Sequence, residues 1–162
     1  MEQIKFEDYL SITSVTFEWA DSYDNKDWDR LRKILASTLL IDYSIVGHQC
    51  FPEMPQDEFV AMMSAPTFLG DPLVRTQHLM GATRYEVISD TEIVGHHQIR
   101  AAHQRYKDLD SKEVEYRGHG HSKVKHWYRK EGGVWKLSGV CPQVYWNEYD
   151  FDKIFPQLSA AH

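Results

Sequence analysis

The 162-residue sequence lacks several features that mark large classes of protein. Its two cysteines, Cys50 and Cys141, are too few for a disulfide framework and do not form a Cys-x-x-Cys pair. No apolar run approaches the roughly 20 residues of a membrane-spanning helix, and the first residues lack the apolar segment of a signal peptide. Repeats, Pro/Gly-rich linkers and nucleotide or metal motifs are also missing. We therefore expect one domain over residues 1–162, cytoplasmic, with no cofactor and no membrane partner.

The charge balance is acidic. The chain carries 24 acidic and 18 basic residues, and its formal net charge of −6 disfavours nucleic acid as a partner. One basic run, Gln98 to Lys107, contains Arg100 and Arg105, but acidic residues follow it directly, so we interpret it as a solvated strand edge. Aromatic residues form 13% of the chain, enough to line a pocket as well as a core. A neutral small molecule is the expected partner.

Apolar residues at helical spacing predict helices near both ends of the chain. The first runs from Phe6 to Tyr23 and the second from Lys26 to Leu35, which puts Tyr23-Asp24 at a helix junction. A third helix lies between Pro55 and Pro66, because proline suits a helix start and disfavours helix just before it. A short terminal helix covers Asp150 to Phe155.

Between the helices lie long segments rich in β-branched and aromatic residues, separated by short polar breaks, which is typical of antiparallel strands. These segments are Leu39 to Ile45, Arg75 to Ser89, Ile93 to Tyr106, Val114 to Lys130 and Val134 to Trp146. The breaks at 89–92 and 130–133 predict hairpin turns. Helices followed by a long curved sheet give an α+β fold in which helices cover a concave face, and this face is the expected pocket.

Alternation divides the strand from Val114 between two faces. One face carries small residues suited to line a cavity: Gly118, Gly120, Ser122 and Val124. His119 and His121 lie on the other face, where a His-x-His pair could begin a metal site. A third ligand at suitable spacing is not evident, so we favour solvent or a subunit interface for this pair.

Polar residues suited to proton transfer are spread along the chain: Tyr23, Asp24, His78, His103 and Ser122. A tyrosine hydroxyl can donate to a developing oxyanion, a carboxylate can orient an imidazole, and a histidine can move a proton near neutral pH. This set suits enolisation and elimination. Cys141 has no histidine placed near it by sequence, so we expect a buried thiol there, and Cys50 is expected in a loop.

Several blocks in one order resemble the scytalone dehydratase family over Phe6 to Phe155. The blocks are Glu18 to Lys33, Ile41-Asp42-Tyr43, Gly70-Asp71-Pro72, Arg75 to His78, His103 to Asp108, His121-Ser122, His126-Trp127-Tyr128 and Asp150-Phe151-Asp152. The resemblance implies a cone-shaped barrel of curved antiparallel sheet, covered by N-terminal helices and closed by a short C-terminal helix, of the nuclear-transport-factor-2-like (SnoaL-like) type. It also implies a cofactor-free, homotrimeric hydro-lyase of fungal melanin and polyketide biosynthesis, which dehydrates a hydroxylated naphthalenone such as scytalone to an aromatic naphthol.

The resemblance implies a role for each matching polar residue. Tyr23 and Tyr43 match the tyrosines that polarise the substrate ketone. His78 matches the acid/base histidine, and Asp24 matches the carboxylate that supports the histidines.

The remaining matching residues concern the leaving group and the substrate-binding surface. His103 and Ser122 match groups that hold and protonate the departing hydroxyl. The substrate-binding residues that the resemblance implies, with the last two as a hydrophobic lid, are Met62, Phe68, Ala101, Val124, Pro142, Val144, Phe151 and Phe155.

One matching position departs from the family pattern. The family has an asparagine where this chain has Val124, and a valine cannot hydrogen-bond a substrate hydroxyl, which predicts a relaxed, shifted or lost substrate preference. Ala101 and Ala102 stand where bulkier residues are expected, which indicates a reshaped pocket. Two alternatives therefore stay open: a related enzyme acting on a larger anthrone-type or hydroanthraquinone polyketide, and a non-catalytic binding module on the same fold.

Overall fold

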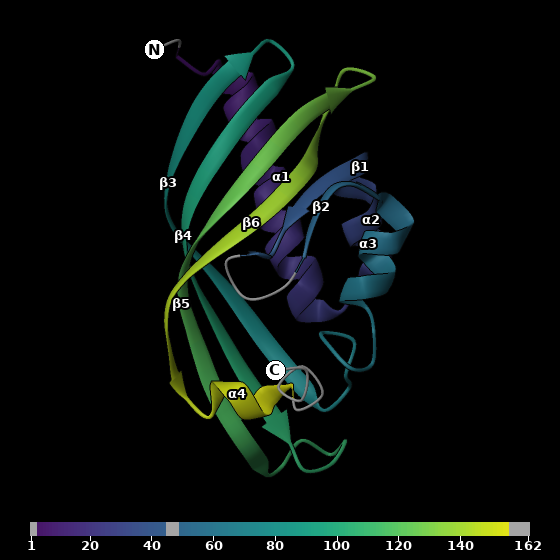
Figure 1. Ribbon diagram of the computed structural model, residues 1–162, viewed down its shortest axis with the longest axis vertical. Coiled ribbons are helices and arrows are strands. Elements are labelled where there is room, and N and C mark those ends of the chain that lie inside the picture. The colour runs from purple at the N-terminus through teal and green to yellow at the C-terminus, as the bar shows by residue number, and fades with distance from the viewer. Residues whose placement is uncertain (1–2, 45–48, 156–162) are drawn as a thin grey trace.

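The computed structural model describes residues 3–44 and 49–155 (Figure 1). Its elements are α1 (Phe6–Asn25), α2 (Trp28–Ile34), β1 (Leu35–Asp42), β2 (Cys50–Pro55), α3 (Gln56–Met63), β3 (Val74–Ser89), β4 (Glu92–Tyr106), β5 (Val114–Glu131), β6 (Val134–Tyr149) and α4 (Phe151–Ile154).

The strands form one six-stranded sheet in the order β2-β1-β6-β5-β4-β3. Its four long strands are joined as successive antiparallel hairpins and curve strongly, with α1, α2 and α3 on the inner side of the curve and α4 below (Figure 1). Both predicted hairpin turns are confirmed, and Gly132 and Gly133 adopt positive φ in the second. The predicted α+β class is confirmed, with the cone formed by an open sheet whose edges are β2 and β3.

Three details of the sheet differ from the prediction. β1 begins at Leu35, directly after α2, and pairs in parallel with β6, whose residues lie about one hundred positions further along the chain. Cys50, expected in a loop, begins the unpredicted strand β2, while Ile45 lies outside the described residues. The basic run on β4 is not a strand edge, because β3 and β5 flank β4 on both sides.

The α1–α2 junction positions the residues that the sequence singled out. α1 forms because its buried residues recur at three- and four-residue spacing and pack against β3 and β6: Ile12, Val15, Thr16, Trp19 and Tyr23. Lys26 ends α1 in the left-handed conformation (φ 55°), and the Asp27 carboxylate then caps α2 by accepting from the backbone N–H of Arg30 at 3.0 Å. Tyr23 and Asp24 therefore lie in the last turn of α1.

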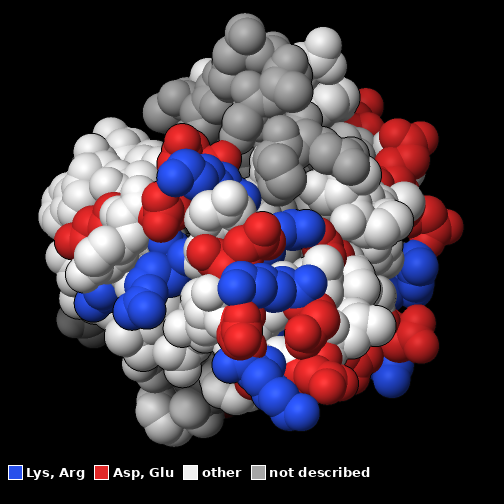
Figure 2. All heavy atoms as spheres, turned by 90° about the horizontal axis from the view of Figure 1, so that it is seen from below, with Lys and Arg blue, Asp and Glu red and all other residues white. Residues whose placement is uncertain are grey.

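Charged side chains of both signs alternate on the face seen in Figure 2. Within the basic run on β4, Arg105 pairs with Asp71, Lys107 pairs with Glu113, and Arg100 lies 3.8 Å from an acidic partner on β6. This pairing removes the basic stripe that a nucleic acid needs. No helix within residues 3–44 and 49–155 is long and apolar enough to cross a bilayer.

Candidate active site

Asp24 and His78 form a directly bonded pair between α1 and β3. One carboxylate oxygen of Asp24 accepts from His78 Nδ1 at 2.7 Å and from Thr76 Oγ1 at 2.9 Å. The other oxygen accepts from the backbone N–H of His78 at 2.8 Å. Because an ionised carboxylate can only accept, Nδ1 of His78 carries a proton and Nε2 is the ring nitrogen left for a ligand. The two side chains are 18% and 10% exposed, so solvent screens this pair weakly.

The pKa of Asp24 reports the balance between burial and hydrogen bonding. Burial raises this pKa, whereas the hydrogen bonds from His78 and Thr76 and the charge of His78 lower it, and the net result lies below the ordinary 3.8. Asp24 is therefore ionised at neutral pH. An ionised carboxylate on Nδ1 stabilises the imidazolium that forms when His78 takes up a proton.

His103 lies beside His78 in a different electrostatic state. It pairs with Thr76 across β3 and β4, its ring centroid is 6.1 Å from that of His78, and it is 5% exposed. Its Nδ1 donates to the carbonyl of Ala101 at 3.1 Å, which leaves Nε2 as an acceptor. Burial, and then the charge of His78, lowers the pKa of His103 to about 3. One imidazole is thus bonded to a carboxylate, and its neighbour is held neutral.

Two tyrosine hydroxyls complete this cluster. Tyr23 is 3% exposed, its ring lies 5.6 Å from that of His78, and its hydroxyl has no hydrogen-bond partner among the described residues. Burial, and then the neighbouring Tyr43, raises the pKa of Tyr23; burial and the nearby Cys141 thiol raise the pKa of Tyr43. Both phenols therefore keep their protons at any working pH and are suited to donate to an oxygen of a ligand.

Strand register brings Ser122 and Ala101 to the same face as the histidines. His78 pairs with Ala101, and Ala101 pairs with Gly120 on β5. Ser122 lies one step further along this face of β5 and pairs with Ile99. The predicted alternation of β5 is confirmed by the burial of Gly118, Gly120 and Val124.

Pro142 and Val144 on β6 pair with residues of the inner face of β5. Pro142 pairs with Val124, and Val144 pairs with Ser122; the side chain of Val124 is 2% exposed and that of Val144 is 38% exposed. Ala102 was expected to reshape the pocket, and this is wrong, because it pairs with Gln77 and His119 on the outer face. Only Ala101 of the alanine pair faces the candidate site.

An aromatic cover, formed by Phe68, Phe151 and Phe155, closes the lower side of the cluster. The rings of Phe151 and Phe155 lie 5.2 Å and 5.7 Å from that of His103, and Phe68 lies 5.0 Å from Phe155. α4 comes this close because β5 has Gly118 there: a Cβ at that position would lie 2.4 Å from Phe151 Cα. Met62 on α3 is partly buried against the core cluster.

The sequence reasoning missed Trp19 and a buried polar group. The Trp19 ring contacts Tyr23, His78 and His126 at centroid distances of 5.1, 5.7 and 4.5 Å, so it orders the cluster from behind. Beyond it, the hydroxyl of Tyr128 bonds Thr16, His97 and His126. The sequence does contain a sign of this buried polar group. By alternation along β5, His126 and Tyr128 lie on the same inner face as Val124.

The His-x-His pair lies apart from this cluster. His121 stacks on Trp146 at 4.6 Å with an interplanar angle of 13°, and His119 meets the edge of Tyr149 at 5.5 Å. Within the described part of the chain, no group of three or more His, Cys, Asp or Glu side chains is placed to hold a metal ion. Cys141 is a half-buried free thiol.

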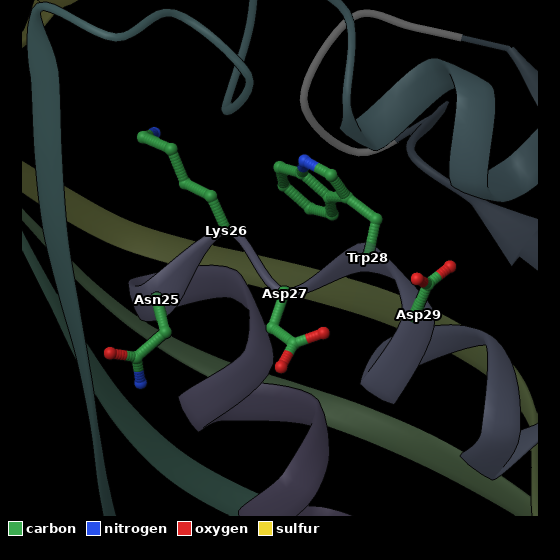
Figure 3. Close-up of a pocket in the computed structure, with 5 residues that line it drawn as sticks. All are labelled: Asn25, Lys26, Asp27, Trp28 and Asp29. Carbon is green, nitrogen blue, oxygen red and sulfur yellow. The ribbon is translucent and has the colours of Figure 1, made fainter.

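A surface hollow lies at the α1–α2 junction, lined by Asn25, Lys26, Asp27, Trp28 and Asp29. Lys26 and Trp28 point to one side, and Asn25 and Asp27 point away from them (Figure 3). Trp28 packs behind Tyr23 at a centroid distance of 6.3 Å, and Lys26 Nζ donates to the carbonyl of Leu69. The hollow contains none of the paired histidines and lies at the outer side of the end of α1 that carries Tyr23 and Asp24.

Comparison with known proteins agrees with this geometry. The sequence model of the scytalone dehydratase family matches residues 3–161. Scytalone dehydratase from Pyricularia oryzae is 53% identical over 154 residues, covering 95% of this chain and 90% of that protein. Scytalone dehydratase arp1 from Aspergillus fumigatus is 53% identical over 152 residues, covering 94% and 90%.

A solved structure, that of Kfla4162 from Kribbella flavida, superimposes with a TM-score of 0.75 at 19% identity, covering 88% of this chain and 93% of that one. This likeness confirms that the two chains share the α+β fold expected from the sequence. Because the family model matches nearly the whole chain and a curated relative is 53% identical over 154 residues, the chain belongs to the scytalone dehydratase family.

Proposed function

We propose that this protein is a hydro-lyase that removes water from a hydroxylated naphthalenone such as scytalone and gives an aromatic naphthol, without a cofactor. The observation that carries this proposal is the Asp24–His78 pair, bonded at 2.7 Å, beside a neutral His103. An elimination needs a base that becomes an acid, and it needs a neutral group that holds the departing hydroxyl. These side chains supply both.

The reaction begins with proton transfer from the carbon beside the ketone to Nε2 of His78. The C–H electrons form an enolate, and the hydroxyls of Tyr23 and Tyr43 donate to its oxygen. Asp24 stabilises the resulting imidazolium through Nδ1.

Loss of the β-hydroxyl completes the elimination. The enolate electrons form the new C=C bond, the C–O bond breaks, and the proton on His78 joins the hydroxide to give water. His103 accepts a hydrogen bond from the departing hydroxyl through Nε2, and Ser122 provides a second polar contact. Because the pKa of His103 is about 3, we assign proton donation to His78 and only the holding role to His103. Aromatisation of the product drives the reaction forward.

The first experiment is single-turnover ultraviolet absorbance of the purified protein with scytalone, against an enzyme-free control. Rapid naphthol formation supports the proposal. The Val124→Asn variant is measured in parallel, because Val124 is 2% exposed and cannot bond a hydroxyl. If wild type is inactive and Val124→Asn is active, Val124 has redirected the site.

A second candidate function is dehydration of a larger aromatic polyketide of the anthrone or hydroanthraquinone type. It is favoured by the small apolar pair Ala101 and Val124 on the inner face, where bulk and a polar group would otherwise restrict the ligand. Turnover of such a polyketide by wild type, without turnover of scytalone, supports this candidate. Saturable ligand binding without turnover supports a binding module instead.

Replacing Tyr23 with phenylalanine should lower kcat by about 10²-fold to 10³-fold, because one donor to the enolate oxygen is lost from a buried site. KM should change less, since the ring is kept. The measurement is steady-state kinetics, with Tyr145→Phe on the exposed end of β6 as the matched control. A kcat within threefold of wild type would exclude Tyr23 as the oxyanion donor.

We also propose a homotrimer built on the outer face of the sheet. A row across the four long strands places Leu79, Arg100, His121 and Trp146 side by side on that face, and Leu79 and Trp146 are 60% and 55% exposed. Large exposed apolar side chains in one patch favour association. Sedimentation equilibrium should give three times the 19.0 kDa chain mass, and Trp146→Glu should give a monomer. A monomeric wild type, or a trimeric Trp146→Glu, would contradict this interface.

A cytoplasmic location is part of the same proposal. Both cysteines within the described residues, Cys50 and Cys141, are free thiols, which suits a reducing compartment.

A further inference from the structure

Arg105 joins two segments that lie far apart in the chain. It is on β4, two residues after His103, and its side chain is 15% exposed. Its Nη1 donates to Asp71 Oδ2 at 2.7 Å, in the segment between α3 and β3, and to the carbonyl of Ile154 at 3.2 Å, in α4. One guanidinium group therefore connects α4 to residues 64–73.

Each of these two segments carries a ring of the aromatic cover. Phe68 lies three residues before Asp71, and Phe155 directly follows Ile154. The two rings are 5.0 Å apart, and Phe155 lies 5.7 Å from His103. The hydrogen bonds of Arg105 thus join the two segments whose rings, Phe68 and Phe155, pack together and shield His103.

The partners of Arg105 are themselves held in place. The second oxygen of Asp71 accepts from the backbone N–H of Leu73 at 2.9 Å, and Lys26 donates to the carbonyl of Leu69 in the same segment. A further carboxylate, Glu115, lies 3.6 Å from Nε of Arg105. Nη1 carries two N–H donors, one for the carboxylate of Asp71 and one for the carbonyl of Ile154, while Nε of the same planar group is directed at Glu115; a lysine ammonium does not offer two separate donor nitrogens in one plane.

We propose that Arg105 is a positioning residue for the reaction: it latches residues 64–73 to α4 and so keeps Phe68 and Phe155 over His103. The kinetic part of this inference rests on the proposed dehydration, whereas the state of His103 can be read without turnover. The charged and titratable groups that act on the pKa of His103 are His78 on β3, Asp24 on α1 and, from the outer face of β5, His119, and replacing Arg105 leaves these three side chains in place.

Opening the latch has a specific electrostatic consequence. Burial is the main reason that the pKa of His103 is about 3, and the rings of Phe151 and Phe155 provide part of that burial. When the cover moves away, water reaches the imidazole and its pKa rises towards the ordinary 6.5. A role confined to general stability has no reason to change this titration in a folded variant.

The test compares Arg105→Met with wild type in two measurements. The first follows the ¹³Cε1 signal of His103 by NMR against pH, assigned by its loss in His103→Asn. The second is the kcat and KM for scytalone. We expect the His103 titration to move to higher pH, KM to rise, and kcat/KM to fall on the order of 10-fold to 10²-fold, as for other losses of positioning. Arg105→Lys should be intermediate, because it keeps one charged contact.

Matched variants separate the possible outcomes. Lys107→Met, which removes an exposed ion pair with Glu113 in the connection between β4 and β5, should leave both measurements unchanged. If Arg105→Met does not fold, Asp71→Asn takes its place, because it breaks the same latch while keeping side-chain shape. An unchanged His103 titration, or a shifted titration with wild-type kinetics, overturns the positioning role. If wild type does not dehydrate scytalone, the proposed function fails, and the NMR titration still decides whether the latch exists.

Discussion

Replacing His78 with asparagine should lower kcat by about 10²-fold to 10⁴-fold, the usual contribution of a positioned acid/base group. The amide can still donate to Asp24, so the bond that links α1 to β3 keeps a partner, and the fold should survive. The amide cannot take a proton from carbon, so the loss should fall on chemistry and leave KM little changed. Stopped-flow absorbance under single-turnover conditions measures this step directly.

The matched control for that variant is His96→Asn. His96 lies on the same strand pair but on the outer face, since its neighbour His97 is fully buried on the inner face. It should keep wild-type kinetics. A His78→Asn variant that retains more than a tenth of wild-type kcat would mean that another group removes the proton, and His103 would then be tested next.

The long elements of the fold could be predicted because their patterns are strong and local. Segments rich in β-branched and aromatic residues identified the long strands, and apolar residues at helical spacing identified the end of α1 that carries Tyr23 and Asp24. Period-two alternation put Ser122 and Val124 on one face of β5 before any register was known. These patterns depend only on residues close together in the sequence, so they can be recognised without knowledge of tertiary contacts.

Features that depend on contacts between distant segments could not be predicted. The parallel pairing of β1 with β6 brings Leu35 beside Leu137, far away in the chain, and the sequence of β1 contains no sign of it. Resemblance brought Asp24, His78 and His103 to one site, but only the structure shows that Asp24 bonds His78. The neutral state of His103 is likewise a product of burial by α4 and neighbouring strands.

Contacts with distant segments give two histidines of the site different surroundings and therefore different proposed roles. His78 and His103 have the same side chain and lie 6.1 Å apart, yet one is bonded to a carboxylate and the other donates to a backbone carbonyl. A carboxylate favours the imidazolium, whereas burial beside a neutral carbonyl disfavours it. The pair is therefore organised before any ligand binds, which is the physical basis of the next expectation.

Replacing Asp24 with asparagine should lower kcat by on the order of 10³-fold to 10⁴-fold, similar to a carboxylate-to-amide change in a serine-protease triad. An amide has one acceptor oxygen, so it cannot accept from Nδ1 of His78, from the backbone N–H of His78 and from Thr76 together. An amide N–H facing Nδ1 would favour the other tautomer, which puts the proton on Nε2 and blocks the base. Asp21→Asn, one turn earlier on α1, removes only a partly exposed ion pair with Arg30 and should keep wild-type kinetics.

The same substitution should change how stability depends on pH. The pKa of Asp24 is lower in the folded protein than its ordinary 3.8, so its ionised form stabilises the fold above that value, and this stabilisation is lost as pH falls through the folded pKa. Asparagine does not titrate there. Urea unfolding between pH 2 and pH 7, values that bracket the usual aspartate range, should show a flatter acid limb for Asp24→Asn than for Asp21→Asn. Identical acid limbs, together with wild-type kcat, would mean that the Asp24–His78 bond carries neither the stability nor the catalysis assigned to it.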